Sequence, residues 1–185
     1  MAKLYLVRHG EPTGSWGTSP DPDPGLSEQG HRQASATAEQ LALKAPAHIV
    51  SSPLRRASET AAPLAGRLQK VPLIAPVVAE IPTPAHVDQA VRGDWLRAIM
   101  AQAWPQIDPE LQQWRARAVD YLIGISGDTA IFSHYVLINV AVGAAIGDDR
   151  VHCFAPAHAS VTLLETNGKG LTLVELGATG TSVIR

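Results

Sequence analysis

The sequence predicts an α/β fold in which helices flank a mostly parallel central sheet. Short apolar runs alternate along the chain with longer stretches of helical periodicity, which is the pattern of strands joined by helical crossovers. The 185 residues are 45% hydrophobic and 17% charged, a globular composition with room for one sizeable core. Because no internal repeat or linker interrupts the chain, residues 1–185 are expected to form a single domain.

Five short runs are predicted to form strands. The first, residues 4–7, is wholly apolar, as in a strand that is buried on both faces of a parallel sheet. The last two flank an Asn-Gly dipeptide, which is typical of tight hairpin turns. Residues 71–81 look extended, but two prolines confine them to a sheet edge or an irregular path. The predicted strands are residues 4–7, 48–51, 130–133, 160–165 and 171–176.

Helical stretches lie between these strands. Ser27 is a good N-cap for the first of them. Ser52 and Pro53 supply the second with an N-cap and a proline at the first helical position. The third begins at Asp94 and is broken near Pro105. The predicted helices are residues 28–43, 54–68, 94–104 and 108–123, followed by an apolar helix that ends near residue 146.

Composition and charge exclude several classes of function. Fifteen Lys and Arg against 17 Asp and Glu give a net charge of −2, so no basic excess would attract nucleic acid or an anionic membrane. The single cysteine, Cys153, excludes a disulfide framework and a cysteine-rich zinc site, and favours a cytoplasmic location. Residues 129–147 carry no Asp, Glu, Lys or Arg, but they include His134 and Asn139 and indicate a buried strand and helix. The N-terminus reaches Arg8 too soon for a signal peptide.

Polar residues follow three of the predicted strands. Arg8 and His9 follow the first, a helix that starts with two adjacent arginines follows the second, and His134 follows the third. Ligands of open α/β sheets bind at the carboxyl ends of the strands, so these side chains are expected to meet in one place. Guanidinium groups hold phosphate oxygens bidentately, and helix N-termini add backbone N–H donors. The residues therefore predict a phosphate pocket that contains imidazoles.

Four ordered motifs then resemble one family. Residues 8–10 (Arg-His-Gly) are similar to the signature of the histidine phosphatase superfamily, which includes the cofactor-dependent phosphoglycerate mutases. Residues 25–34, residues 51–61 and residues 133–134 (Ser-His) resemble three further segments of that family in the same order. The resemblance covers most of the chain. It implies a three-layer, phosphoglycerate mutase-like sandwich.

This resemblance also implies a role for each of five residues. His9 is implied as the nucleophile that accepts the phosphoryl group, and Arg8 and Arg56 as the groups that hold its oxygens. His134 is implied as a second imidazole that stabilises the transferring group. Glu80 stands where the family places its proton donor.

Two features depart from the family pattern. The residues after the implied donor differ from those of the family, so Glu11, Asp88 and His86 remain open as alternative acids. Tyr135 replaces the glycine that usually follows the second histidine, and it is expected to bind substrate. No His-Glu-x-x-His motif and no cysteine pair is present, so neither a metal nor another cofactor is expected.

The implied reaction is hydrolysis of a small phosphorylated substrate, with inorganic phosphate as a product. The mutases carry lysine and paired arginines between the acid and the second histidine, and this segment has neither. Three alternative functions stay open: mutase-type phosphoryl transfer, hydrolysis of phosphohistidine in proteins and passive phosphate binding. The sequence does not indicate the oligomeric state. Arg92 and Arg97 are candidates for holding a second anionic group of a substrate, and His158 is a candidate for the pocket rim.

Overall fold

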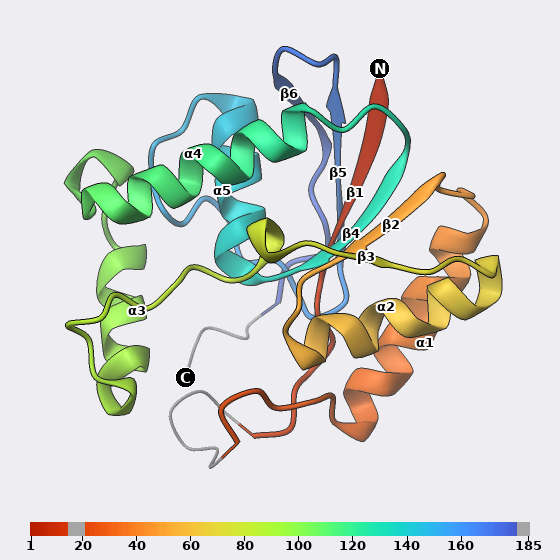
Figure 1. The fold of residues 1–185 in the computed structure, drawn as a ribbon, viewed down its shortest axis with the longest axis horizontal. Coiled ribbons are helices and arrows are strands. Elements are labelled where there is room, and N and C mark those ends of the chain that lie inside the picture. Colours follow the sequence, from red (N-terminus) through yellow and green to blue (C-terminus); the bar gives the residue numbers. More distant parts are fainter. Residues whose placement is uncertain (15–20, 181–185) are drawn as a thin grey trace.

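A computed structural model describes residues 1–14 and 21–180 of the chain (Figure 1). They form one six-stranded sheet in the order β3-β2-β4-β1-β5-β6. The first four strands of the sequence run parallel, β5 runs antiparallel to β1, and β6 pairs with β5 as a hairpin. The strands are β1 (Ala2–Arg8), β2 (His48–Ser51), β3 (Leu73–Ile74), β4 (Thr129–Ser133), β5 (Val161–Thr166) and β6 (Leu171–Glu175).

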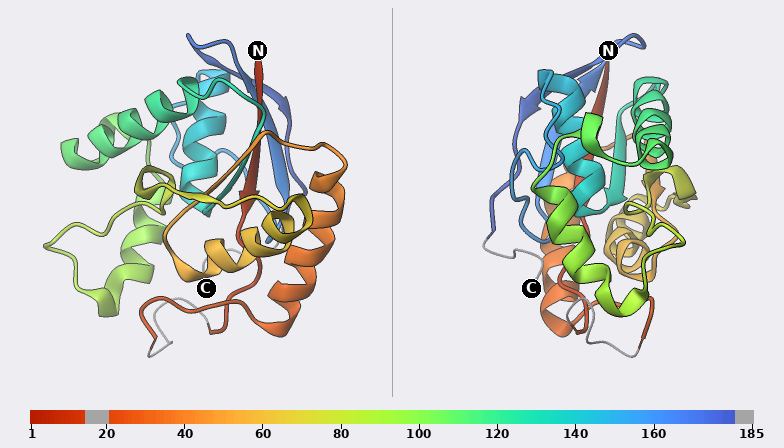
Figure 2. Two further views of the ribbon diagram at one scale, coloured as in Figure 1. Left: turned by 45° about the vertical axis from the view of Figure 1, so that its right-hand side comes forward. Right: turned by 90° about the vertical axis from the view of Figure 1, so that its left-hand side faces the viewer.

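Helices lie on both sides of this sheet, which confirms the three-layer α/β sandwich with a mostly parallel sheet (Figure 2). One side carries α1 and α2, and the other carries α4 and α5 (Figure 1). Helix α3 precedes α4 in the sequence and contributes to the same core as α4 and α5. The helices are α1 (Glu28–Ala42), α2 (Arg55–Leu68), α3 (Arg92–Met100), α4 (Pro109–Ile123) and α5 (Tyr135–Ile146).

The side chains of β1 divide between the two cores. Leu4 and Leu6 pack into the core formed with α4 and α5, whereas Tyr5 and Val7 pack into the core formed with α1 and α2. Successive side chains of a strand point to opposite faces, so a strand covered on both sides needs an unbroken apolar run. The prediction of a doubly buried strand at residues 4–7 is therefore confirmed.

Some predicted boundaries are confirmed and others are wrong. Ser27 is the N-cap of α1, and its hydroxyl accepts from the N–H of Gly30 at 3.0 Å. The N-cap prediction for Ser52 is wrong: α2 starts at Arg55, and Leu54 is still extended with φ −68° and ψ 134°. The Ser52 hydroxyl accepts from the N–H of Leu54 at 3.2 Å, so it closes a turn before the helix.

The segment between α2 and α4 also differs from the prediction. Only Leu73–Ile74 pair as a strand within the stretch predicted as extended, and Pro76–Val78 form one turn of 3₁₀ helix. Proline cannot donate to a sheet ladder, which keeps the paired part this short. Helix α3 begins at Arg92, two residues before the predicted start. None of the described helices is both long and apolar enough to cross a membrane.

Two glycines allow the loop after β1 to touch α1. A Cβ on Gly30 would lie 2.1 Å from the carbonyl oxygen of Glu11, and a Cβ on Gly10 would lie 2.7 Å from that of Gly30. Both obstacles are backbone atoms, so neither can rotate away. The loop that follows the predicted nucleophile is thus held against α1 by direct backbone contact.

Gly30→Ala is expected to destabilise the fold by about 1–3 kcal/mol because the new methyl group overpacks this contact. Gly66→Ala in α2 is the matched control, since nothing lies within 4 Å of its added Cβ. There the change is expected to stabilise by about 1 kcal/mol through helix propensity. Urea unfolding of both variants measures the difference. An equal gain in stability at both positions would contradict the close approach.

Candidate active site

The expected residues meet at the carboxyl ends of three neighbouring strands. Arg8 ends β1 and His9 follows it, Ser52 follows β2, and His134 follows β4. In the sheet these strands lie side by side in the order β2-β4-β1. The five residues with implied catalytic roles are all buried, with exposed fractions between 0% and 7%. They are Arg8, His9, Arg56, Glu80 and His134.

His9 is oriented by hydrogen bonds on both its backbone and its ring. Its N–H donates to the carbonyl of Ser133 at 3.0 Å. Its Nδ1 lies 2.8 Å from the carbonyl of Gly10, and because a carbonyl only accepts, Nδ1 carries the proton. Nε2 is then an acceptor, and the Nε–H of Arg56 donates to it at 3.3 Å. The pKa of His9 lies well below its usual value because of burial first and then because of His134, Arg56 and Arg8.

His134 provides a second neutral imidazole beside the first. The two ring centroids are 5.2 Å apart. Nε2 of His134 is 2.8 Å from the hydroxyl of Ser52, which joins the ends of β4 and β2. Burial, followed by the charges of Arg56, Arg8 and Arg92, holds the pKa of His134 well below its usual value. Both rings are therefore uncharged at neutral pH.

Arg8 and Arg56 place positive charge beside these rings. Arg8 donates from Nη1 to the carbonyl of Pro156 at 2.8 Å, and its guanidinium carbon lies 5.0 Å from the ring centroid of Tyr135. Burial lowers the pKa of Arg8 to about 10, so it remains a cation at neutral pH. Burial also lowers the pKa of Arg56, which lies 3.6 Å from a carboxylate oxygen of Asp23. Two buried guanidinium groups around an imidazole suit a phosphoryl group and its charged oxygens.

Glu80 is a buried residue of the irregular segment that follows β3, and its carboxyl group contacts the first turn of α5. Its Oε1 accepts from the N–H of Ile81 at 3.0 Å and from the N–H of Val136 at 3.1 Å. Burial raises the pKa of this carboxyl, although these two N–H groups and the charges of Arg92 and Arg56 act in the opposite direction. A raised pKa favours the protonated form that a general acid needs.

The alternative acids lie in less suitable surroundings. Glu11 accepts from the hydroxyl of Ser27 at 2.8 Å, which ties it to the N-cap of α1. Asp88 accepts from the N–H of Ala90 at 2.8 Å, and both Asp88 and His86 are exposed. Among the candidates, burial and the nearby charges of Arg92 and Arg56 favour Glu80.

Two further residues contribute to the walls of the site. The ring of His158 is centred 5.6 Å from that of His9, and burial together with the charge of Arg8 lowers its pKa to about 4. The expectation that His158 reaches the pocket is met by this contact. Tyr135 is buried under Arg8, and its hydroxyl lies 3.1 Å from Nδ1 of His152.

The contact of Ser52 with His134 was not predicted, because the local sequence indicates only a helix cap at Ser52. The available signal was its position directly after the strand at residues 48–51, because a residue there reaches the same sheet edge as the residues that follow the neighbouring strands.

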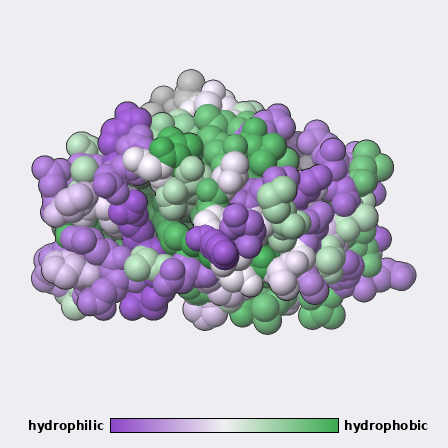
Figure 3. Space-filling view, turned by 90° about the horizontal axis from the view of Figure 1, so that it is seen from above, coloured by the Kyte–Doolittle hydropathy of each residue, from purple (hydrophilic) through white to green (hydrophobic). Residues whose placement is uncertain are grey.

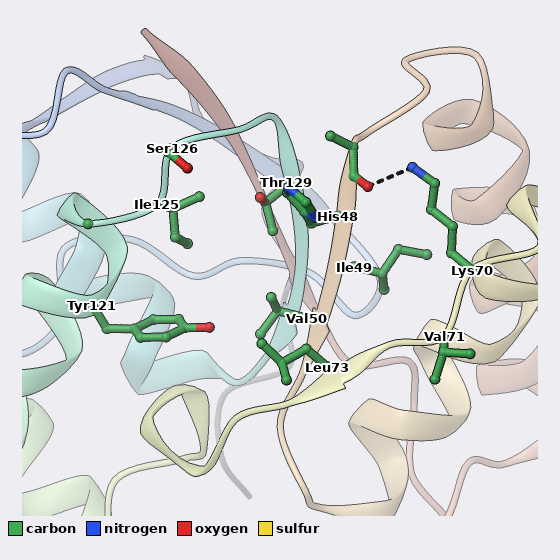
Figure 4. Close-up of a pocket in the computed structure, with 12 residues that line it drawn as sticks. His48, Ile49, Val50, Lys70, Val71, Leu73, Tyr121, Ile125, Ser126 and Thr129 are labelled. Atoms are coloured by element: carbon green, nitrogen blue, oxygen red, sulfur yellow. Dashed lines mark hydrogen bonds between the residues drawn. The ribbon is translucent and has the colours of Figure 1, made fainter.

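A groove with a volume of about 450 Å³ lies at the other end of the sheet, where β2 and β4 begin (Figure 4). His48, Leu73, Tyr121 and Thr129 are among its lining residues, and Lys70 beside them donates to the carbonyl of Ala47 at 2.7 Å. Seen from the end of the molecule at which β1 starts, hydrophobic side chains gather in the middle between more hydrophilic sides (Figure 3). None of the residues with implied catalytic roles lines this groove.

Two neutral imidazoles between buried guanidinium groups, at the carboxyl end of a mostly parallel sheet, define a site suited to phosphoryl groups. Residues 4–179 match the family model described as histidine phosphatase superfamily (branch 1), and the chain belongs to this family. The resemblance of the four motifs is thereby confirmed.

Solved structures and a curated protein add to this comparison. A mycobacterial glucosyl-3-phosphoglycerate phosphatase in complex with inorganic phosphate has 25% identity and a TM-score of 0.72, over 97% of this chain and 98% of that one. A phosphoserine phosphatase from Entamoeba histolytica in complex with 3-phosphoglyceric acid has 23% identity and a TM-score of 0.74, over 97% and 98%. PE-PGRS family protein PE_PGRS11 of Mycobacterium tuberculosis is 44% identical over 82 residues, which is 42% of this chain but only 14% of that protein.

Proposed function

We propose that this chain hydrolyses phosphomonoesters through a phosphohistidine on His9. The observation that carries the proposal is the ring geometry of His9. Its Nδ1 is bound to the carbonyl of Gly10, and its Nε2 lies 3.3 Å from the Nε of Arg56. A neutral imidazole thus directs its lone pair to the place where a guanidinium group would hold a phosphoryl oxygen.

In the first half of the reaction, Nε2 of His9 attacks phosphorus and forms an N–P bond while the ester P–O bond breaks. Arg8 and Arg56 neutralise the charge on the phosphoryl oxygens, and His134 stabilises the transferring group. The leaving oxygen takes the proton of Glu80 and departs as an alcohol. Splitting hydrolysis in this way replaces one difficult step with two easier ones.

In the second half, water takes the place of the alcohol. The Glu80 carboxylate accepts a proton from that water, the new O–P bond forms, and the N–P bond breaks. Inorganic phosphate leaves, and both His9 and Glu80 return to their starting states. Tyr135 forms the wall beneath Arg8 and is proposed to shape the part of the pocket that receives the substrate.

Hydrolysis is favoured over mutase-type transfer by the segment between Glu80 and His134. This segment contains no lysine and no adjacent arginine pair that could grip a second phosphate. The similar phosphatase that binds inorganic phosphate supports the same choice.

We propose a small phosphorylated substrate, a single domain and a cytoplasmic location. Mutase activity and hydrolysis of phosphohistidine in proteins are the alternatives.

Phosphate release from a panel of phosphorylated metabolites is expected to continue unchanged in EDTA. The reason is that Arg8 and Arg56 already supply the positive charge that a metal ion would otherwise bring. Rates with EDTA, and after adding back a divalent ion, measure this. Loss of turnover in EDTA that the ion restores would contradict metal independence, and interconversion of phosphoglycerates without net phosphate release would favour the mutase.

A further inference from the structure

Arg92 binds the chain directly after Glu80. It is the first residue of α3, and its Nε–H donates to the hydroxyl of Thr83. Its Nη2 donates to the carbonyl of Ile81 at 3.3 Å. One guanidinium group therefore joins two points of the irregular segment that carries the carboxyl group.

The segment is also fixed on the side that precedes Glu80. The hydroxyl of Ser133, at the end of β4, donates to the carbonyl of Val78 at 2.7 Å. Glu80 thus lies between an attachment to the sheet and an attachment to Arg92. The carboxyl group itself accepts from Ile81, the residue whose carbonyl Arg92 binds. Loss of the arginine would free one end of this short stretch.

We infer that Arg92 is a positioning residue that holds Glu80 in place for proton transfer to the leaving group. The inference rests on the proposed function. It differs from the expectation that Arg92 meets a second anionic group of the substrate. The Nε and Nη2 atoms of Arg92 bind Thr83 and Ile81, and its Nη1 is buried. The guanidinium group therefore faces the segment after Glu80. Arg97, by contrast, is exposed and bonds Asp94 on its own helix.

Arg92 also affects the charge of the acid. Glu80 is faced by Arg92 from α3, Arg56 from α2, Arg8 from β1 and Tyr135 from α5. Burial raises the pKa of Glu80, and the Arg92 cation lowers it. Burial lowers the pKa of Arg92 itself to about 10, so its charge is present at neutral pH. Without this cation the pKa of Glu80 rises, and the acid stays protonated to higher pH.

The test compares Arg92→Gln, Arg92→Lys and the control Arg67→Gln on an alkyl phosphate and on p-nitrophenyl phosphate across pH. In Arg92→Gln, kcat/KM for the alkyl phosphate, which reports the first half of the reaction, is expected to fall roughly 10–100-fold, the scale of a misplaced catalytic group. The activated ester needs little proton donation and should lose less than about 3-fold. The alkaline limb of the alkyl phosphate profile should move to higher pH, because the loss of the Arg92 cation raises the pKa of Glu80.

Arg92→Lys separates charge from geometry. Lysine keeps the cation but cannot reproduce the fork, so the rate should fall while the alkaline limb stays near that of the wild type. Arg67→Gln changes an exposed arginine of α2 that bonds Glu39, and it should match the wild type on both substrates. If Arg92→Gln lost the same factor in rate on both substrates, or if its alkaline limb did not move, the positioning role would be overturned and the proposed function would remain. A wild-type protein that hydrolyses neither substrate would refute the proposed function and this role with it.

Discussion

Replacing His9 by alanine is expected to lower the turnover of every phosphomonoester by at least ~10⁴-fold, the scale seen when a nucleophile is removed. The proposed path needs an N–P bond at Nε2 of His9, which lies beside the guanidinium group of Arg56. The neighbouring His134 has its own Nε2 bound to Ser52 at 2.8 Å. The measurement is phosphate release by His9→Ala on alkyl and aryl esters alike.

The control for this variant is His31→Ala. His31 lies on α1 and is exposed, with its Nε2 4.0 Å from a carboxylate oxygen of Glu59, so its loss should leave the rate unchanged. Thermal unfolding of both variants separates lost chemistry from lost folding. His9→Ala that stays folded and retains more than about a hundredth of the wild-type rate would contradict a histidine nucleophile.

Glu80→Gln is expected to slow hydrolysis of alkyl phosphates by roughly 10²–10⁴-fold, the usual contribution of general acid catalysis. An amide keeps the size of the side chain but cannot donate the proton to the leaving alkoxide. The loss on p-nitrophenyl phosphate should be much smaller because its leaving group needs little protonation. Parallel measurements of kcat/KM, which reports only the first half of the reaction, give the contrast between the two esters.

This contrast also separates the proton-donor role from misfolding, which would lower both rates alike. Glu11→Gln tests the nearest rival carboxylate. Glu11 is bound to the Ser27 hydroxyl at 2.8 Å, so its replacement is expected to affect both esters to a similar extent. Equal losses on the two esters in Glu80→Gln would place the acid elsewhere, at Glu11 or His86.

The parts of the fold that rest on local rules could be predicted from the sequence. The apolar run at residues 4–7 indicates a doubly covered strand, and Ser27 provides the cap of α1. The strand-end rule predicts that His9 and His134 meet, because their strands β1 and β4 are parallel neighbours. In these cases one short segment, or one rule of sheet topology, determines the position of the side chain.

Contacts between segments without a regular pattern could not be predicted. Arg92 meets Ile81 and Thr83 only because an irregular chain and the start of α3 fold back on each other. No periodicity marks such a contact, and the same arginine fits a solvated helix face equally well. Ser52 is a different case. Its place before Pro53 fits the sequence pattern of a helix N-cap, and that local pattern does not indicate its bond to His134.

The most direct test of the account is to trap the phosphoryl group on the protein. Wild-type protein is mixed with a ³²P-labelled phosphomonoester, quenched in alkali or denaturant, and analysed for label that acid removes. A phosphohistidine intermediate predicts acid-labile label on the peptide that contains His9. His9→Ala should carry none. Steady turnover of the wild type without any trapped label, or with label on another residue, would contradict a phosphohistidine on His9.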